Sequence, residues 1–228
     1  MEALGPKYRC YALDFWGFGE SGKKRDSYAV SDFMELVKQF MDALGIESAP
    51  LIGHSMGGTT SLGTALRYPN RIRKVCVIGS PITGASLSVF LKLAGVEWIG
   101  SLVRNMPNLL GWGLRAFAPL ITRNPQIWYP MITRDISKTT VASFFSSIDS
   151  LRRTDLRPEL NQLKMPVTGI YGQKDVIVHP KQYRPLQAGV PQAHIDIMPR
   201  SGHFPMLDEP ELYLSHIHSF LGREHGSV

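Results

Sequence analysis

Three residues of the sequence have the types and the chain order that nucleophilic catalysis requires. Ser55 lies at the centre of the sequence Gly-His-Ser-Met-Gly over residues 53–57, and Asp175 and His203 follow far along the chain. A serine hydroxyl is a weak nucleophile until a base removes its proton, and that base must be oriented by a carboxylate. We therefore interpret Ser55 as a nucleophile, His203 as its general base and Asp175 as the orienting acid.

The surroundings of Ser55 make this pattern more specific than the pattern Gly-x-Ser-x-Gly alone. A short apolar run over residues 49–53 precedes the serine, and a helical run of small residues over 57–68 follows it. This is the context of a strained strand-to-helix turn, in which the backbone N–H of Met56 faces a developing oxyanion. The alternative is that Ser55 only caps the N-terminus of the helix.

Asp175 and His203 each follow an expected strand. Asp175 comes after the strand expected over 166–171, and His203 after the one over 194–198. The carboxyl ends of parallel strands share one edge of a sheet, which brings the three residues together in the chain order Ser, Asp, His. The alternatives are an ordinary loop aspartate and a structural histidine. The remaining histidines lie before the serine, on the closing helix, in the tail or beside elements without a turn motif: His54, His216, His218, His225, His179 and His194.

The elements that must position these residues alternate along the chain. We expect strands over residues 8–14, 49–53, 73–78, 166–171 and 194–198. We expect helices over residues 30–44, 57–68 and 207–221. This alternation predicts an α/β fold, a mostly parallel sheet with helices on both faces.

Residues 83–160 interrupt the alternation. They contain no clear strand and three of the four tryptophans. A structureless loop of that length is rare, so we expect a helical cap over 83–160, inserted between two parts of a core, 1–82 and 161–228. Trp98, Trp112 and Phe117 predict an apolar substrate pocket in this cap, although packing of cap helices on the core would explain each of them equally well.

One competing motif lies near the N-terminus. Residues 17–22, Gly-Phe-Gly-Glu-Ser-Gly, also fit the dinucleotide fingerprint Gly-x-Gly-x-x-Gly. That fingerprint needs a helix that begins at the glycines, so that the helix N-terminus holds a pyrophosphate. Helical periodicity begins only near residue 30. We therefore expect no dinucleotide site.

Taken together, the motifs resemble the α/β-hydrolase superfamily. Gly-His-Ser-Met-Gly-Gly over 53–58 is similar to the nucleophile turn of esterases, lipases, haloperoxidase-like enzymes and carbon–carbon bond hydrolases. The family's Asp-x-x-Gly-x-Gly-x-Ser loop is matched from residue 14, and its acid and base loops by Tyr-Gly-x-x-Asp at 171–175 and Ser-Gly-His at 201–203. The resemblance implies a serine hydrolase that cleaves carboxylic esters of apolar acyl or aromatic substrates, with neither cofactor nor metal. Carbon–carbon bond hydrolase and cofactor-free haloperoxidase or perhydrolase are the alternatives within the family.

The sequence departs from this family at its N-terminal end. Family members have several strands and a helix before the counterpart of Tyr8, and a His-Gly loop there supplies the second oxyanion donor. We therefore expect an N-terminally truncated core in which Met56 is one oxyanion donor and the second is not present in this chain. A catalytically impaired fragment or a non-hydrolytic ligand-binding protein is the corresponding alternative function.

Composition and charge exclude several other classes. The net charge is +6, but the basic residues are scattered, so we expect no nucleic-acid partner. No uncharged apolar run is long enough to span a membrane, and no secretory leader is recognised, so we expect a cytoplasmic location.

Residues 83–134 hold five basic residues against one acidic residue, together with tryptophans. This pattern predicts peripheral membrane contact through the cap.

Overall fold

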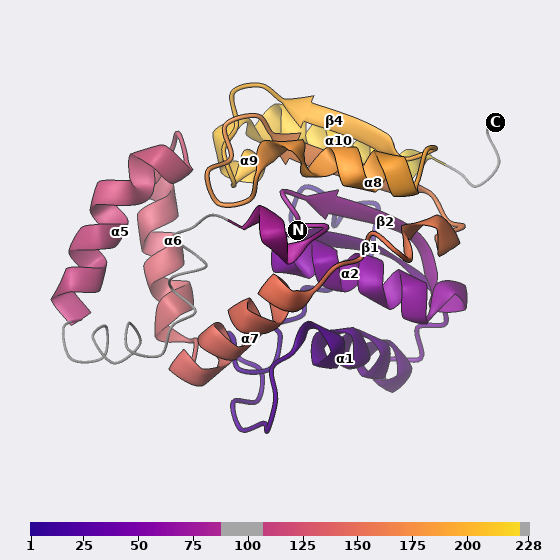
Figure 1. The fold of residues 1–228 in the computed structure, drawn as a ribbon, viewed down its shortest axis with the longest axis horizontal. Helices are drawn as coiled ribbons and strands as arrows, with labels where there is room; N and C mark the ends of the chain where they lie inside the picture. The colour runs from indigo at the N-terminus through magenta and orange to yellow at the C-terminus, as the bar shows by residue number, and fades with distance from the viewer. Residues whose placement is uncertain (88–106, 224–228) are drawn as a thin grey trace.

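A computed structural model describes residues 1–87 and 107–223 of the chain (Figure 1). Four strands form one sheet: β1 (Ala49–His54), β2 (Ile72–Ile78), β3 (Val167–Gly172) and β4 (His194–Met198). They are hydrogen-bonded in the order β1-β2-β3-β4, and each pair is parallel. The helices of the described residues are α1 (Val30–Ala43), α2 (Met56–Arg67), α5 (Pro107–Ile121), α6 (Pro125–Ser137), α7 (Val141–Arg153), α8 (Tyr183–Gly189), α9 (Pro205–Asp208) and α10 (Pro210–Gly222).

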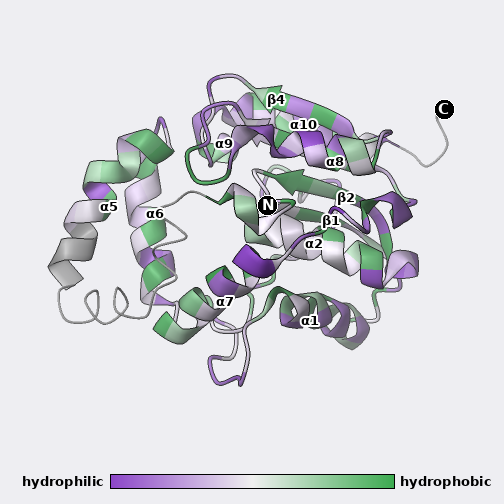
Figure 2. Ribbon diagram, viewed as in Figure 1, coloured by the Kyte–Doolittle hydropathy of each residue, from purple (hydrophilic) through white to green (hydrophobic). Residues whose placement is uncertain are grey.

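Helices cover both faces of this sheet, and the alternation along β2 explains why. Val75 and Val77 point into a core that contains side chains of α1, α2 and α8. Cys76 and Ile78 point to the opposite face, into a core with side chains of α10. All four side chains are buried. Figure 2 shows the hydrophobic colour of the central strands. Successive residues of a strand face opposite sides, so an apolar run such as that of β2 needs cover on both. The predicted α/β architecture is confirmed.

The strand expected over residues 8–14 is wrong. This segment has no regular secondary structure, and among the residues that the structure describes β1 pairs only with β2. A strand is stabilised by its hydrogen-bonded neighbour, and the apolar pattern of this segment did not reveal that it has none. Aromatic contacts of this segment and of Phe15, the residue after it, attach this part of the chain to α1 instead. Phe15 stacks on Phe33 with ring centroids 4.4 Å apart, and Tyr11 meets Phe40 edge-on at 5.7 Å.

The closing helix expected over 207–221 is divided into α9 and α10. Glu209, between them, has φ −140° and ψ 66°, outside the helical region. Pro210 explains the break, because the residue before a proline is pushed out of the helical conformation. The break leaves Asp208 at the end of a short separate helix.

Most of the described part of the inserted segment is helical. Helices α5 and α6 pack against each other and lie to one side of the sheet, whereas α7 runs beside α1 (Figure 1). The Val30 N–H donates to Ser150 Oγ at 3.0 Å and thereby ties α7 to the start of α1. No helix in the described ranges is long and apolar enough to cross a bilayer. The cap boundaries and the expected membrane contact stay predictions.

Close packing of α2 on the end of β1 depends on glycine. A Cβ at Gly58 would lie 1.9 Å from Ser80 Oγ and 2.8 Å from the carbonyl oxygen of Gly53. A Cβ at the preceding residue, Gly57, would meet no atom within 4 Å. Two adjacent glycines of one helix therefore differ completely in the space around them.

We expect Gly58→Ala to lower the free energy of unfolding by about 1–3 kcal/mol, because the added methyl group forces Ser80 or the backbone to move. Gly57→Ala is the matched control. It should leave stability unchanged or raise it by up to about 1 kcal/mol, because alanine is the better helix residue. Urea denaturation followed by circular dichroism measures both. Equal stability of the two variants would contradict this account of the packing.

Candidate active site

Ser55 occupies a strained turn between β1 and α2. Its φ of 53° and ψ of −123° make it the single non-glycine residue with positive φ within residues 1–87 and 107–223. Such a conformation costs about 1–3 kcal/mol and persists only where the surroundings enforce it. The Ser55 N–H donates to the carbonyl of Ile78 at 2.8 Å, which anchors the turn to β2. The Ser55 side chain makes no capping hydrogen bond, so the alternative of a simple N-cap serine is wrong.

Met56 is the first residue of α2. The N–H groups of a first helical turn have no partner inside the helix, and they lie at the positive end of its dipole. The Met56 N–H directly follows the Ser55 carbonyl group in the chain. It is therefore able to donate to an anionic oxygen that forms beside the serine.

Asp175 and His203 form a buried hydrogen-bonded pair. His203 Nδ1 lies 2.7 Å from Asp175 Oδ2, and the two residues are only 4% and 6% exposed. A carboxylate can only accept, so the Nδ1–H of the imidazole is the donor. This bond fixes the tautomer and leaves Nε2 of His203 as the nitrogen that can take a proton. Asp175 lies in the loop after β3 and His203 in the loop after β4, as the sequence predicts.

The other oxygen of Asp175 is also satisfied. Asp175 Oδ1 accepts the N–H groups of Ile177 at 2.8 Å and Val178 at 2.9 Å. The loop after β3 thus folds around the carboxylate and leaves Oδ2 for His203. Gly79, after β2, lies beneath the pair. A Cβ there would be 3.3 Å from Asp175 Oδ2 and 3.4 Å from His203 Nδ1, and its φ of 52° also favours glycine.

His54 contributes a contact that sequence reasoning missed. Its Nε2 lies 2.7 Å from the carbonyl oxygen of His203 and donates to it, and the two rings are 4.7 Å apart. Burial, and to a smaller extent repulsion between the two imidazole rings, lowers the pKa of His54 to about 3, so this ring stays neutral at physiological pH. The residue before the serine therefore holds the backbone of the loop that carries His203. A polar residue at the end of an apolar run was the available signal.

The structure brings two of the three predicted residues into direct contact and places the third at the same edge of the sheet. Ser55, Asp175 and His203 all lie beyond the carboxyl ends of their strands. Among the described residues, no hydrogen bond joins Ser55 Oγ to His203. In unliganded enzymes such bonds are often long and shorten only when substrate binds.

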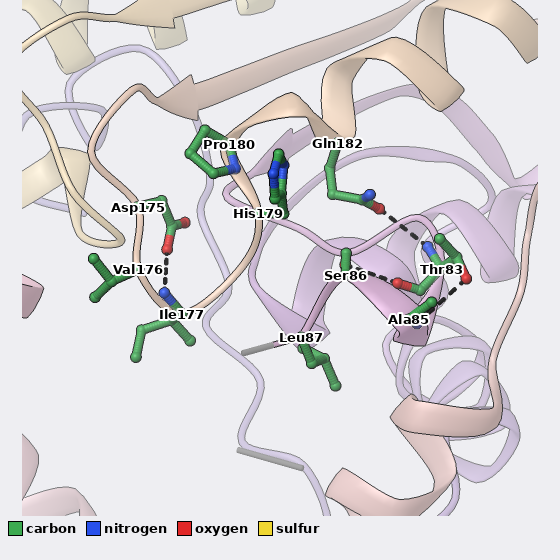
Figure 3. A pocket seen from close by; sticks show the side chains of 10 residues that line it. All are labelled: Thr83, Ala85, Ser86, Leu87, Asp175, Val176, Ile177, His179, Pro180 and Gln182. Atoms are coloured by element: carbon green, nitrogen blue, oxygen red, sulfur yellow. Dashed lines mark hydrogen bonds between the residues drawn. The ribbon is translucent and has the colours of Figure 1, made fainter. Parts of the chain in front are cut away.

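A cavity of about 470 Å³ opens beside Asp175 (Figure 3). One wall is the loop after β3, with Val176 and Ile177, and the other is the segment 83–87, with Leu87. The His179 N–H donates to the Ser86 carbonyl at 3.0 Å and holds the two walls together. The cavity combines apolar side chains with several polar ones and one buried carboxylate, a mixture found in small-molecule sites.

Two of the three aromatic residues expected to form a substrate pocket, Trp112 and Phe117, do not line this cavity. Trp112 is 78% exposed and Phe117 is 50% exposed, both on α5. Trp98 lies outside the described residues. Their role in substrate binding stays a prediction.

Residues 17–22 form a turn rather than the start of a helix. The Gly17 N–H donates to the Gly22 carbonyl at 2.9 Å, and the next helix, α1, begins only at Val30. The Glu20 N–H donates to Asp14 Oδ2 at 2.9 Å and closes the loop on its own carboxylate. The helix N-terminus on which a dinucleotide fingerprint depends is not at these glycines.

Comparison with known proteins agrees with this architecture. A structure of the enol-lactonase from Burkholderia xenovorans superposes with a TM-score of 0.82 at 24% identity, covering 97% of this chain and 84% of that chain. In sequence, the chain is 27% identical to a 2-hydroxy-6-oxononadienedioate/2-hydroxy-6-oxononatrienedioate hydrolase of Paraburkholderia phymatum, over 95% of this chain and 77% of the relative. It is 26% identical to a pimeloyl-[acyl-carrier protein] methyl ester esterase of Nitrosomonas europaea, over 94% and 86% respectively.

The family match covers nearly all of the described core. The family model for the alpha/beta hydrolase fold matches residues 1–210, a range that contains the strained serine turn and the Asp175–His203 pair. The parallel sheet with helices on both faces is the architecture of that family. With the strands, the turn and the family match in agreement, the chain belongs to the α/β-hydrolase family.

Proposed function

We propose that this chain is a serine hydrolase that cleaves carboxylic esters of apolar acyl or aromatic substrates through an acyl-enzyme intermediate. The observation that carries the proposal is the buried hydrogen bond between His203 Nδ1 and Asp175 Oδ2, at the sheet edge where Ser55 occupies its strained turn. Acyl transfer needs a nucleophile, a general base and a carboxylate that orients the base, and Ser55, His203 and Asp175 have these residue types at one edge of the sheet. The esterase among the relatives supports this reaction class.

The proposed reaction has two halves, formation of the acyl-enzyme and its hydrolysis. Ser55 Oγ attacks the ester carbonyl carbon while His203 Nε2 takes the hydroxyl proton, and the Met56 N–H donates to the resulting oxyanion. The C–O bond to the alcohol breaks, and His203 returns the proton to the leaving oxygen. Water then attacks the acyl-enzyme by the same route and releases the acid. Asp175 keeps the imidazole in the required tautomer throughout.

We place the apolar part of the substrate in the cavity beside Asp175. Its lining includes Leu87, Val176 and Ile177, and it lies next to the carboxylate that orients His203. A substrate held there by its apolar group would have its reacting carbon near the same edge of the sheet. The cap and its aromatic residues are proposed to cover this region.

A carbon–carbon bond hydrolase is the second candidate. It is favoured by the named activity of the Paraburkholderia phymatum relative and by a 2-hydroxymuconate semialdehyde hydrolase of Pseudomonas putida, which is 25% identical. Both reactions add water across a bond to a carbonyl carbon. An assay with a vinylogous 1,5-diketone beside the ester separates the two candidates, because only one substrate will be consumed at a useful rate.

We expect a fluorophosphonate probe to form a covalent adduct on Ser55, located by peptide mass spectrometry. Ser55→Ala should abolish the adduct and lower hydrolysis of a short-chain p-nitrophenyl ester about 10³-fold or more, because the nucleophile is removed. His203→Gln should slow labelling as well, because the proton acceptor is lost. Ser215→Ala is the matched control, since this exposed serine bonds only the carbonyl of Leu212. It should retain full activity.

The opposite result is equally informative. A folded wild-type chain without any adduct on Ser55 would favour the alternative of a ligand-binding protein or impaired enzyme. Equal ester turnover by the wild type and Ser55→Ala would show that the turnover is background.

We expect Val176→Asn to raise KM for an apolar ester about tenfold while kcat changes less, because the amide replaces apolar contact in the cavity without adding charge. Leu212→Asn, a similar change at an exposed position of α10 that does not line the cavity, is the control and should leave KM unchanged. Steady-state kinetics with esters of two acyl lengths measures both. An unchanged KM in Val176→Asn would remove the cavity from the proposed substrate site.

A further inference from the structure

The loop that carries His203 is held by the carboxylate of Asp208. Asp208 Oδ2 accepts the N–H of Gly202, the residue before His203, at 2.7 Å. Its other oxygen, Oδ1, accepts the hydroxyl of Thr122 at 2.6 Å and the N–H of Arg123 at 2.7 Å. Thr122 and Arg123 form the turn between α5 and α6. One side chain therefore joins this turn to the His203 loop.

The carboxylate is enclosed by its partners. Asp208 is only 7% exposed, and Thr122 is 3% exposed. A buried carboxylate needs hydrogen bonds to both oxygens. When a single donor is lost, part of the free-energy cost of burying the charge is no longer compensated. Because the donors belong to two different segments, the carboxylate can satisfy both oxygens only while the segments keep their present separation.

Further contacts place the same two segments directly against each other. A Cβ at Gly202 would lie 2.5 Å from the carbonyl oxygen of Ile121, so the backbone of the α5–α6 region touches the backbone of the His203 loop. Trp128 of α6 packs on Phe204, the residue after His203, with ring centroids 6.0 Å apart. The Asn124 side chain donates to the carbonyl of Leu207. The α5–α6 turn and the histidine loop are thus one packed unit.

We propose that Asp208 is a positioning residue that couples the α5–α6 turn to His203. Asp208 holds the Gly202 N–H and His54 holds the His203 carbonyl, so the backbone is fixed both at His203 and at the residue before it. A shift of the α5–α6 turn, such as one caused by ligand binding at the cap, moves the general base through this carboxylate. The catalytic role of His203 in this inference rests on the proposed function, whereas the coupling between the α5–α6 turn and the His203 loop does not.

The coupling is tested at Thr122, which is distant in sequence from every residue assigned a chemical role. Thr122→Val removes the hydroxyl donor and keeps the shape of the side chain. We expect kcat for ester hydrolysis to fall about 10- to 100-fold with KM nearly unchanged, because a misplaced base slows chemistry rather than binding. Thr122→Ser, which keeps the hydroxyl, should restore kcat. Thr133→Val is the control, because the Thr133 hydroxyl bonds only the Tyr129 carbonyl of its own helix.

Hydrogen exchange at the Gly202 amide gives a readout that does not require turnover. It should become faster in Thr122→Val, return to the wild-type rate in Thr122→Ser and stay unchanged in Thr133→Val. In an Asp208→Asn background, Thr122→Val should add little further effect, because the two act through one carboxylate.

The outcomes separate this inference from the proposed function. Unchanged exchange at Gly202 together with unchanged kcat in Thr122→Val would overturn the coupling, even if Ser55 is a working nucleophile. A full additional effect of Thr122→Val in the Asp208→Asn background would overturn it too. Faster exchange that Thr122→Ser reverses, in a chain without esterase activity, would support the coupling and refute the proposed function.

Discussion

The rest of the site depends on the buried hydrogen bond between His203 and Asp175. Both side chains are buried, and a polar group buried without its partner costs about 1–3 kcal/mol or more. The bond therefore persists only while the loops after β3 and β4 keep a fixed separation. Parallel pairing of these strands, which aligns Gly172 with Met198, fixes the starting points of both loops. Gly79 leaves the space in which the two side chains meet.

The serine turn depends on the same sheet through different contacts. Its positive φ is maintained by the hydrogen bond from Ser55 to the Ile78 carbonyl and by the close approach of α2 to the end of β1. Small residues allow that approach, since side chains at Gly53 or Gly58 would meet backbone atoms. The strain is therefore balanced by packing that the sheet and helix provide together.

The core and the outer helices have different relations to chemistry. Strands β1, β3 and β4 position the residues proposed to react, whereas α5 and α6 contact that machinery through the turn at Thr122 and through Trp128. Relatives with ester and carbon–carbon substrates match the same chain over most of its length. This is consistent with a family in which a constant core carries the catalytic groups and variable segments select the substrate.

The sequence alone was sufficient for the α/β alternation, for four of the five expected strands, and for the positions of Ser55, Asp175 and His203 beyond the ends of their strands, because apolar periodicity and turn motifs are local signals. It could not exclude the strand over residues 8–14, since pairing depends on a neighbour that no local pattern reveals. It also missed His54 and Asp208, whose partners lie 149 and 86 positions away. The first contact exists because the sheet brings the ends of its strands to one edge, and the second because the α5–α6 turn packs against the His203 loop. Tertiary structure thus decided how the predicted residues are held, since a hydrogen bond between distant segments has no counterpart in residue spacing.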